Sequence, residues 1–423
     1  MADPRTSPKA GASDAGRPGN RLLLYIHVPV HQGRNGELLI EPQAANGLRL
    51  WAENFSRVTV MQPLKPGTSD PGGLCPVSDI PGAERITFDP LPMAYRPDQF
   101  MRRFPATQRR IRDNIARADY LCFSLGGLWG DWGAVSSIMA RRMNRPYSVW
   151  ADRVESQVVK HLGQSAGGRA GLRARLNWRP MAVLEKWVIR RAALGLFHGR
   201  ETYDHYAPLC RQPQLVHDIH VAEADHLDAG DLRRKQQQAA GGPLRIVYVG
   251  RAVPMKGPFD WIETLRGLAR TGVDFHATWL GDGPLLDDMR SAIDAAGLSG
   301  RVALPGFVQD RQAVLDALRQ AHVMLFCHKT PESPRCLIEA LISATPLVGY
   351  DGAFAADLVS RHQGGELVPL GDTESLTRVL ADLCRDRVRL ARLMERALRD
   401  AAGFSDSAVF THRSRLIHEY LRA

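Results

Sequence analysis

The chain has 423 residues, of which 44% are hydrophobic and 24% charged, so it is long enough to bury more than one core. These fractions exclude a disordered or a fibrous chain. The six cysteines lie apart, without a C-x-x-C pair or a metal-ligand spacing. This spacing argues against a disulfide framework and against a zinc site, and we expect a reducing, cytoplasmic environment.

The first 20 residues are rich in Pro, Gly, Ala, Ser and Asp, and they lack the basic start and apolar run of a secretory signal. We expect residues 1–20 to form a disordered leader. The apolar stretch that follows, Leu22–Val30, has about half the length that a membrane-spanning helix needs. The sequence therefore predicts a soluble protein.

The net charge of +10 is concentrated in one part of the chain. Residues 101–200 contain 19 Lys and Arg but only 6 Asp and Glu, whereas the rest of the chain has a small acidic excess. Such a region can attract phosphates or an anionic membrane surface, or it can be a set of solvated helix faces. We expect no nucleic acid as a partner, because no recognition motif or aromatic array accompanies the basic residues.

The first half of the chain alternates short apolar runs with helical patterns, which is typical of a layered α/β domain. We expect this domain to cover residues 21–215. Its predicted strands are Leu22–Val28, Arg57–Met61, Tyr120–Ser124, Tyr147–Ala151 and Leu194–His198. Its predicted helices are Ala44–Phe55, Ser136–Met143 and Pro180–Ala193.

A polar interval, residues 216–242, predicts a linker to a second α/β domain over residues 243–404. The predicted strands of that domain are Leu244–Val249, Phe275–Leu280, Val302–Leu304, Val323–Cys327, Leu347–Tyr350 and Gly365–Val368. The predicted helices are Pro258–Ala269, Leu285–Ala296, Gln312–Gln320, Cys336–Ser343, a helical region from Glu374, and a last helix over Ser407–Leu421. Two such domains leave a cleft at the carboxyl ends of their strands, where α/β proteins bind ligands.

The sharpest local motif follows the strand Leu244–Val249. Gly250 and Arg251 are separated by four residues from Lys256 and Gly257, directly before a predicted helix. Glycines allow a close approach of the backbone, and two cations near a helix N-terminus can neutralise a diphosphate. The alternative is an ordinary strand-to-helix turn with surface cations.

A second motif surrounds the start of the predicted helix Cys336–Ser343. Glu332 and Glu339 can accept hydrogen bonds from sugar or ribose hydroxyls. The backbone amides of Arg335, Cys336 and Leu337 can donate to phosphate oxygens, because the first amides of a helix have no partner within it. Either glutamate can instead cap the helix.

Five motifs in this order resemble the donor-binding domain of retaining glycosyltransferases of family 4, which have the GT-B fold. The resemblance extends from Leu244 to Gly403. The matching segments are Val249–Gly257, the Gly-x-Gly-Pro turn Gly281–Pro284, the Pro-Gly-Phe-Val segment Pro305–Val308, Glu339–Leu341 with Thr345–Val348, and the closing loop Leu367–Asp372.

The resemblance implies two Rossmann-like domains facing across a cleft, with the C-terminal helix, residues 405–423, returning to the N-terminal domain. It implies transfer of a hexose, with retention, from a UDP- or GDP-sugar to a glycan or a lipid-linked acceptor. The process implied is bacterial cell-surface polysaccharide or lipopolysaccharide biosynthesis, in the cytoplasm or peripherally at the inner face of the cytoplasmic membrane.

The resemblance also implies roles for individual residues. Arg251 and Lys256 would bind the donor diphosphate, and Glu339 would hold the ribose. The Gly-x-Gly-Pro turn would contribute Gly283, and the base would lie near Gly306, Phe307 and Val308. In the family, seven residues separate an earlier glutamate from the ribose-binding one. Here six separate Glu332 from Glu339, and Pro331 occupies the family position. We expect Glu332 to act as the substitute.

The first half resembles the family only in general layout. Family members often carry a histidine after the third or fourth strand, but here Tyr147–Ala151 is followed by Asp152 and Arg153. Asp152 can orient an acceptor hydroxyl, or it can pair with Arg153 or another cation. A loop after the first strand, expected to face the acceptor or the donor phosphates, consists of Gly33, Arg34, Asn35 and Gly36.

The predicted catalytic set is therefore Arg251, Lys256, Glu332 and Asp152, with no protein nucleophile. Because the chain has no Asp-x-Asp pair, we expect no metal and no other cofactor. Two alternatives stay open: a GT-B nucleotide-sugar epimerase, and a non-catalytic protein that binds glycan or nucleotide.

The helix Pro180–Ala193 raises the question of membrane contact. It places Met181, Leu184 and Val188 on one side, beside Lys186, Arg190 and Arg191. A basic amphipathic helix can lie on anionic lipid, but an apolar stripe at this spacing can equally face the core.

Overall fold

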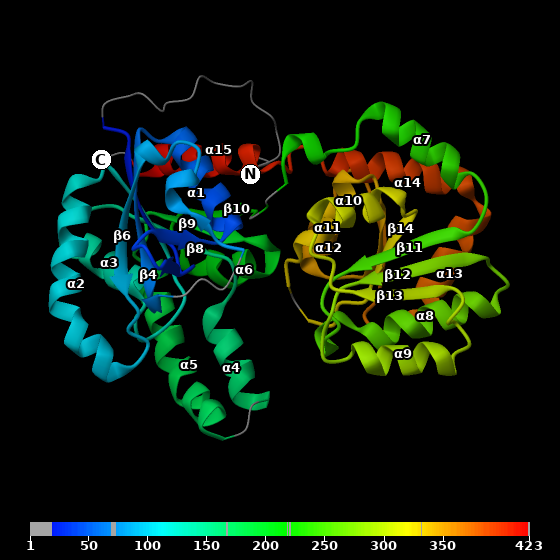
Figure 1. Cartoon of the computed structure of the whole chain (residues 1–423), viewed down its shortest axis with the longest axis horizontal. Helices are drawn as coiled ribbons and strands as arrows, with labels where there is room; N and C mark the ends of the chain where they lie inside the picture. The colour runs from blue at the N-terminus through cyan, green and yellow to red at the C-terminus, as the bar shows by residue number, and fades with distance from the viewer. Residues whose placement is uncertain are drawn as a thin grey trace. The chain divides into compact units, whose positions relative to one another are not determined.

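The computed structural model describes residues 19–68, 73–165, 168–217, 219, 221–330 and 332–421 (Figure 1). The chain divides into two compact units. The first contains the residues up to 220 and those from 406 onward, and the second contains residues 221–405. The leader predicted over residues 1–20 lies, up to residue 18, outside the described residues.

The first unit is built on a parallel sheet. Its neighbouring strands, in spatial order, are β10 (Pro213–Val216), β9 (Leu194–His198), β8 (Ser148–Ala151), β7 (Tyr120–Ser124), β1 (Arg21–Tyr25), β4 (Arg57–Thr68) and β6 (Ile86–Pro92). The chain order reverses at β1, which pairs with β4 on one side and β7 on the other. Ligands of open α/β sheets bind beside such a switch point.

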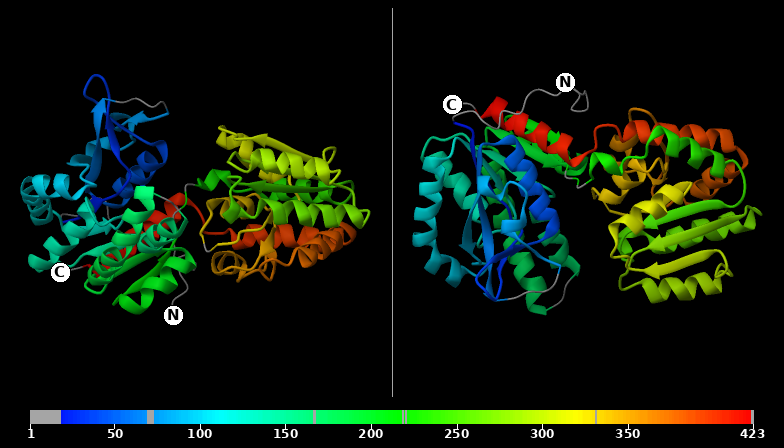
Figure 2. Two further views of the ribbon diagram at one scale, coloured as in Figure 1. Left: turned by 90° about the horizontal axis from the view of Figure 1, so that it is seen from below. Right: turned by 45° about the horizontal axis from the view of Figure 1, so that its top comes forward.

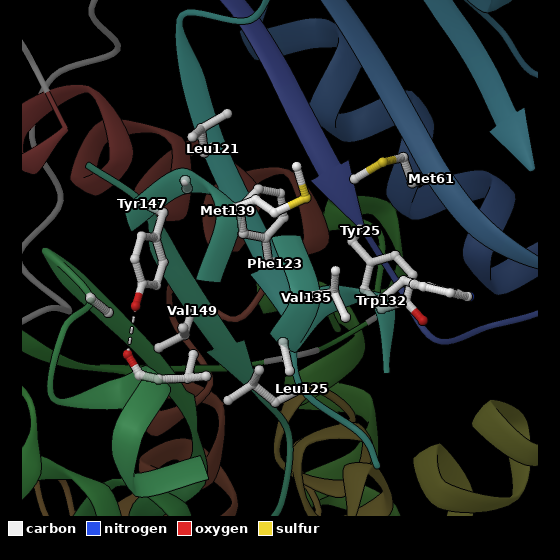
Figure 3. Close-up of a cluster of buried hydrophobic side chains, with 14 of the residues drawn as sticks. Tyr25, Met61, Leu121, Phe123, Leu125, Trp132, Val135, Met139, Tyr147 and Val149 are labelled. Atoms are coloured by element: carbon white, nitrogen blue, oxygen red, sulfur yellow. Dashed lines mark hydrogen bonds between the residues drawn. The ribbon is translucent and has the colours of Figure 1, made fainter. Parts of the chain in front are cut away.

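Both faces of this sheet are buried. On β1, Leu23 and Tyr25 point into one apolar cluster, drawn in Figure 3, and Leu22 and Leu24 point into another. This two-sided burial explains why the strand reads as an apolar run without alternation. In the first cluster the Tyr147 hydroxyl donates to the Val188 carbonyl at 2.8 Å, which satisfies the polar end of a buried ring (Figure 3).

The helices of the first unit are α1 (Pro42–Asn54), α2 (Pro97–Arg117), α3 (Trp132–Arg142), α4 (Glu155–Ser165), α5 (Gly168–Ile189), α6 (Gly199–Tyr206) and α15 (Asp406–Tyr420). The C-terminal helix α15 packs on α1, red against blue in the right-hand view of Figure 2, with the Phe410 ring 5.2 Å from that of Trp51. The predicted return of the last helix to the N-terminal domain is confirmed. Within the described residues, no helix combines the length and the apolar character needed to cross a bilayer.

The second unit has a six-stranded parallel sheet. Its spatial order is β13 (Val302–Gly306), β12 (Phe275–Leu280), β11 (Leu244–Val249), β14 (Val323–Phe326), β15 (Leu347–Tyr350) and β16 (Gly365–Val368). Its helices are α7 (Ala229–Ala239), α8 (Pro258–Arg270), α9 (Leu286–Ala295), α10 (Arg311–Gln320), α11 (Arg335–Ile342), α12 (Ala353–Val359), α13 (Thr373–Arg385) and α14 (Arg387–Asp400). This strand order is the doubly wound, Rossmann-like arrangement, so the prediction of two such domains is confirmed.

The interval predicted as a linker, residues 216–242, contains the helix α7, which packs within the second unit. Lys235 of α7 is 4% exposed, and its ammonium donates to the Ser343 carbonyl at 2.7 Å and to the Thr345 hydroxyl at 2.6 Å. Because most α7 residues are polar and its one lysine is buried by hydrogen bonding, the hydrophobic pattern did not reveal this helix.

Candidate functional site

The Gly-Arg motif forms the turn between β11 and α8. Gly257 has φ 62°, and a Cβ there would lie 2.1 Å from the Cys327 carbonyl oxygen. A Cβ on Gly250 would lie 2.7 Å from the Tyr248 hydroxyl oxygen. No side chain fits these spaces without moving backbone or a buried ring. The glycines therefore let the turn that carries Lys256 pack directly on the segment after β14.

This packing brings Lys256 to Glu332. The Lys256 ammonium lies 2.6 Å from a Glu332 carboxylate oxygen, and the two side chains are 13% and 17% exposed. Burial raises the pKa of Glu332, and the lysine charge opposes that shift. The structure thus brings together two of the predicted catalytic side chains, while Pro331, the residue at the family's glutamate position, lies outside the described residues.

Two residues that no sequence motif indicates, His328 and Tyr248, extend the contacts of this pair. His328 Nδ1 is 3.5 Å from the other Glu332 oxygen, and its Nε2 is 2.8 Å from the Tyr248 hydroxyl. Burial, assisted by the charge of Lys256, lowers the pKa of His328 to about 2, so the ring is neutral. Burial also raises the pKa of Tyr248, so its phenol stays protonated. The sequence offered only one signal, which is that His328 follows directly after a predicted strand.

The Gly-x-Gly-Pro turn after β12 packs on the same β11 turn. A Cβ on Gly281 would lie 2.0 Å from the Gly250 carbonyl oxygen, and one on Gly283 would lie 2.5 Å from that of Ala252. The Gly281 amide donates to the Gly306 carbonyl at 2.9 Å, and this hydrogen bond joins the end of β13 to the turn after β12. The segments that follow β11, β12 and β13 are therefore held together at the carboxyl edge of the sheet.

Two predicted donor-binding side chains at this edge are open to solvent. Arg251 is exposed and makes no side-chain hydrogen bond or ion pair to any residue that the structure describes. Phe307 is 74% exposed, directly after Gly306, whose φ of 83° ends β13; Val308 is half-buried. A guanidinium available for phosphate and an aromatic face available for stacking suit a nucleotide.

Glu339 lies one turn into α11 and is partly buried. Burial raises the pKa of its carboxyl, while the nearby charges of Arg311 and Arg335 oppose the shift. The Glu339 carboxylate makes no hydrogen bond to the described part of the chain, so it is available to a ligand.

The predicted helix-start amides are only partly available. The Leu337 amide donates to the Pro334 carbonyl at 3.2 Å, so the prediction that this amide is unbonded is wrong, because the first turn of α11 closes on itself. Burial raises the pKa of the Cys336 thiol to about 12, which leaves the thiol protonated. The amides of Arg335 and Cys336 stay predicted phosphate donors.

In the first unit, Asp152 directly follows β8. Its carboxylate is exposed and accepts a hydrogen bond of 2.7 Å from the Trp150 indole. Arg153 forms its ion pair with Glu155, at 2.7 Å. Asp152 therefore has a fixed side chain at the carboxyl edge of the sheet, and its role toward an acceptor stays a prediction.

The predicted loop of Gly33, Arg34, Asn35 and Gly36 is not a simple connection after the first strand. It is the turn of a β-hairpin formed by β2 (Val30–Gln32) and β3 (Leu38–Ile40), closed by the Gly33 amide donating to the Glu37 carbonyl at 2.8 Å. β3 also pairs with the short strand β5 (Cys75–Pro76). The first strand therefore does not lead directly into α1, and Arg34 and Asn35 are exposed on a hairpin.

A further cluster at the switch point was also missed. His27 follows β1, with Nδ1 2.9 Å from the Ser124 hydroxyl and Nε2 3.5 Å from Asp131. Asp131 is 4% exposed and accepts a hydrogen bond from the Ala134 amide, which caps α3. A Cβ on Gly126 would lie 2.4 Å from the His27 ring. The cluster joins segments about a hundred residues apart in the sequence, which no local motif could reveal.

Comparison with known proteins identifies a matching family model and several relatives. Residues 231–400 match the family model of glycosyl transferases group 1. The chain is 28% identical over 239 residues to 2-deoxystreptamine N-acetyl-D-glucosaminyltransferase of Streptomyces fradiae, covering 54% of this chain and 56% of that protein. It is 29% identical over 247 residues to the putative colanic acid biosynthesis glycosyltransferase WcaL of Escherichia coli K12, covering 50% and 60%. The chain thus spans little more than half the length of these relatives.

Solved structures share the fold over nearly the whole chain. Anabaena Alr3699/HepE in complex with UDP matches with a TM-score of 0.61 and 16% identity, over 93% of this chain and 98% of that one. WaaG, a glycosyltransferase involved in lipopolysaccharide biosynthesis, matches with a TM-score of 0.60 and 14% identity, over 94% and 99%. At these identities the likeness establishes the architecture, and the predicted GT-B fold is confirmed.

Proposed function

We propose that this chain, whose residues 231–400 belong to the glycosyl transferases group 1 family, transfers a hexose from a nucleoside-diphosphate sugar with retention of the anomeric configuration. The observation that carries the proposal is the edge formed after β11, where Lys256 meets Glu332 at 2.6 Å beside the exposed Arg251. A catalyst of this reaction needs fixed positive charge where a diphosphate leaves.

The proposed donor is a UDP- or GDP-sugar. Arg251 and Lys256 bind its diphosphate, Glu339 accepts hydrogen bonds from the ribose, and the base lies by Phe307. A structural relative named as a complex with UDP supports a nucleotide of this kind. The exposed Arg251 guanidinium supports placing the diphosphate at Arg251, and the unbonded Glu339 carboxylate supports placing the ribose at Glu339.

In the proposed step, the bond from the anomeric carbon to the diphosphate oxygen breaks, and the acceptor oxygen bonds to the same carbon on the same face. The acceptor proton passes to the leaving phosphate. Arg251 and Lys256 stabilise the growing charge, and Glu332 orients the sugar. These cations supply the charge that a metal ion supplies elsewhere, so the proposal requires no metal and no cofactor.

The proposed acceptor is a glycan or a lipid-linked glycan of bacterial surface polysaccharide or lipopolysaccharide biosynthesis, bound by the first unit near Asp152. Relatives named for colanic acid, amylovoran and lipopolysaccharide core biosynthesis support this process. The proposed location is the cytoplasm, with peripheral contact at an anionic membrane. Because two relatives are named as 2-deoxystreptamine glycosyltransferases, 2-deoxystreptamine must be among the acceptors that are tested.

The test is release of nucleoside diphosphate from UDP-, GDP- and ADP-sugars, with bacterial lipid extract, 2-deoxystreptamine or no acceptor. We expect one nucleotide to be released, more with one acceptor, and not by Lys256→Ala or Glu339→Ala. Lys329→Ala is the matched control, because this lysine is also ion-paired, at 2.7 Å to Asp260.

Other outcomes select the alternatives. Conversion of the donor to its epimer without an acceptor would identify an epimerase. Binding of a nucleotide or a glycan without turnover would identify a binding protein. Absence of nucleotide-sugar binding, with the two variants behaving like the wild type, would reject the site.

A further inference from the structure

One helix of the first unit presents apolar side chains to solvent. On α5, Leu172, Leu176 and Val183 are 59%, 67% and 67% exposed. Five of the seven large hydrophobic side chains described as exposed in this unit lie on α4 and α5. Figure 1 shows these two helices side by side, extending away from the sheet of their unit. The unit itself therefore leaves this surface uncovered.

The exposed residues form one face of α5. They are separated by four and seven residues, a spacing that places them within one narrow sector of an α-helix. The opposite sector is core, because Ala174, Met181 and Val188 are at most 4% exposed. The apolar stripe of Met181, Leu184 and Val188, considered for lipid contact from the sequence, therefore faces the core, and a different stripe faces solvent.

Cations lie in the same sector as the exposed leucines. Arg179, Lys186 and Arg190 follow Leu172 by 7, 14 and 18 residues, close to whole helical turns, and all three are exposed. The one acidic residue of α5, Glu185, is buried and accepts hydrogen bonds from the amide and hydroxyl of Ser156 at 2.9 and 2.6 Å. The face thus combines leucines and cations without an acidic side chain of α5.

The neighbouring helix extends this surface. On α4, Val158 and Leu162 are 41% and 49% exposed, and the Lys160 ammonium lies 5.4 Å from the centre of the Trp178 ring of α5. Arg179 lies 5.2 Å from the same ring. An aromatic ring flanked by cations is suited to the boundary between lipid headgroups and acyl chains.

We propose that the α4–α5 hairpin, residues 155–189 with Arg190, is the surface through which the protein docks on an anionic bilayer. Leucines inserted at the headgroup boundary bury apolar area, and the cations beside them meet lipid phosphates. A second copy of the chain fits less well, because a symmetric contact through this face would bury the three cations without an acidic side chain of α5 to pair with them. This inference places the membrane contact proposed above and does not depend on glycosyl transfer.

The test is co-sedimentation of the full chain with vesicles of phosphatidylcholine, alone or mixed with phosphatidylglycerol. The wild type should bind the mixed vesicles, less at high salt, and should bind pure phosphatidylcholine weakly. The variant L172E/L176E/V183E should bind the mixed vesicles at least about tenfold more weakly, and R179E/K186E/R190E should lose the lipid preference. Val388→Glu is the matched control, because Val388 is 62% exposed on α14 of the other unit and should not change binding.

A second measurement does not depend on a multiple substitution. A fluorophore attached at Leu176→Cys should shift to shorter wavelength with mixed vesicles, and one at Val388→Cys should not. Wild-type vesicle binding by the triple variant, or no shift at residue 176, overturns the proposal. So does a dimer in ultracentrifugation that the α5 variants dissociate while vesicle binding stays unchanged. Nucleotide release with a soluble acceptor should be the same in all these variants, which separates failure of docking from failure of the proposed transfer.

Discussion

The two units place their charge differently. In the second unit, cations lie at the carboxyl edge of the sheet, where Lys256 is 13% exposed against Glu332 and Arg251 is open to solvent. In the first unit, the basic excess lies largely on helices, and the carboxyl edge at the switch point holds instead His27 and the buried Asp131. Charge fixed at a strand end can act on one bound phosphate, whereas charge on an exposed helix face acts on an extended surface.

The difference predicts that charge removal has unequal effects in the two units. A buried or half-buried cation at the sheet edge acts in a low dielectric and has no competing water, so its loss should be large. A single cation on the α5 face is hydrated and screened, so its loss should be small.

The largest effect is expected from Lys256→Ala. Under the proposed mechanism it removes a fixed positive charge from the leaving diphosphate, and it leaves the Glu332 carboxylate partly buried without its cation. We expect kcat to fall by about 10²- to 10³-fold. Steady-state nucleotide release measures it. The matched change on the other surface, Lys186→Ala, should leave kcat with a soluble acceptor unchanged; equal losses in the two variants would contradict the comparison.

Acid stability should depend on the neutral ring of His328. Burial lowers the folded pKa of His328 to about 2, far below the usual histidine value of about 6.5, so between these values the unfolded chain binds a proton that the folded chain does not. Stability from this group is complete above pH 6.5 and is lost as the pH falls toward 2, by up to about 1.4 kcal/mol per pH unit.

The variant His328→Gln isolates that contribution. Between pH 6.5 and 4 its free energy of unfolding, from urea denaturation, should fall less steeply than that of the wild type. His276→Gln, at an exposed position of β12, is the control and should keep the wild-type slope. Parallel slopes for the wild type and His328→Gln would show that His328 is not buried as a neutral ring.

The Lys256–Glu332 pair should compete with the donor. Because the carboxylate neutralises the ammonium at 2.6 Å, Glu332→Gln leaves the lysine charge available to the diphosphate. We expect UDP or GDP to bind about three- to tenfold more tightly, while transfer slows because the sugar loses its carboxylate. Calorimetry measures the binding. Glu366→Gln, which breaks the 2.6 Å pair with Arg389, is the control; weaker nucleotide binding by Glu332→Gln would argue against competition.

Whether the sequence predicts a residue of a site depends on how far that residue lies along the chain from its partners. Around β11 and α11 the candidate functional residues lie in short segments, so the sequence alone predicts the motif of Gly250, Arg251, Lys256 and Gly257. The pairing of Lys256 with Glu332 could be expected only in outline, since it joins residues 76 positions apart across a tight glycine contact. The bridge from Tyr248 through His328 left no pattern, because neither residue belongs to a motif.

In the first unit the sequence predicts the central strands but neither the hairpin nor the solvent-facing side of α5. The strands β1, β7, β8 and β9 are buried on both faces, so their apolar runs were predicted well. The hairpin of β2 and β3 was not predicted, because each strand has three residues, too few for a period to emerge. On α5 an apolar stripe was predicted correctly as helical, but which of two stripes faces solvent depends on the partner helices, which the sequence does not show.

The smallest effect is expected at Asp152, the residue of the first unit that is proposed to bind the acceptor. Its carboxylate is exposed, so a hydrogen bond to an acceptor hydroxyl there competes with water. Asp152→Asn keeps the size and one oxygen for the Trp150 indole, which donates to it at 2.7 Å. We expect the acceptor KM to rise by about two- to threefold, with kcat and nucleotide affinity unchanged. Asp113→Asn, at a 59% exposed side chain of α2, should leave KM unchanged. A fall in nucleotide affinity in Asp152→Asn would place this residue on the donor side, because an interaction with the acceptor alone cannot change the binding of a nucleotide in its absence.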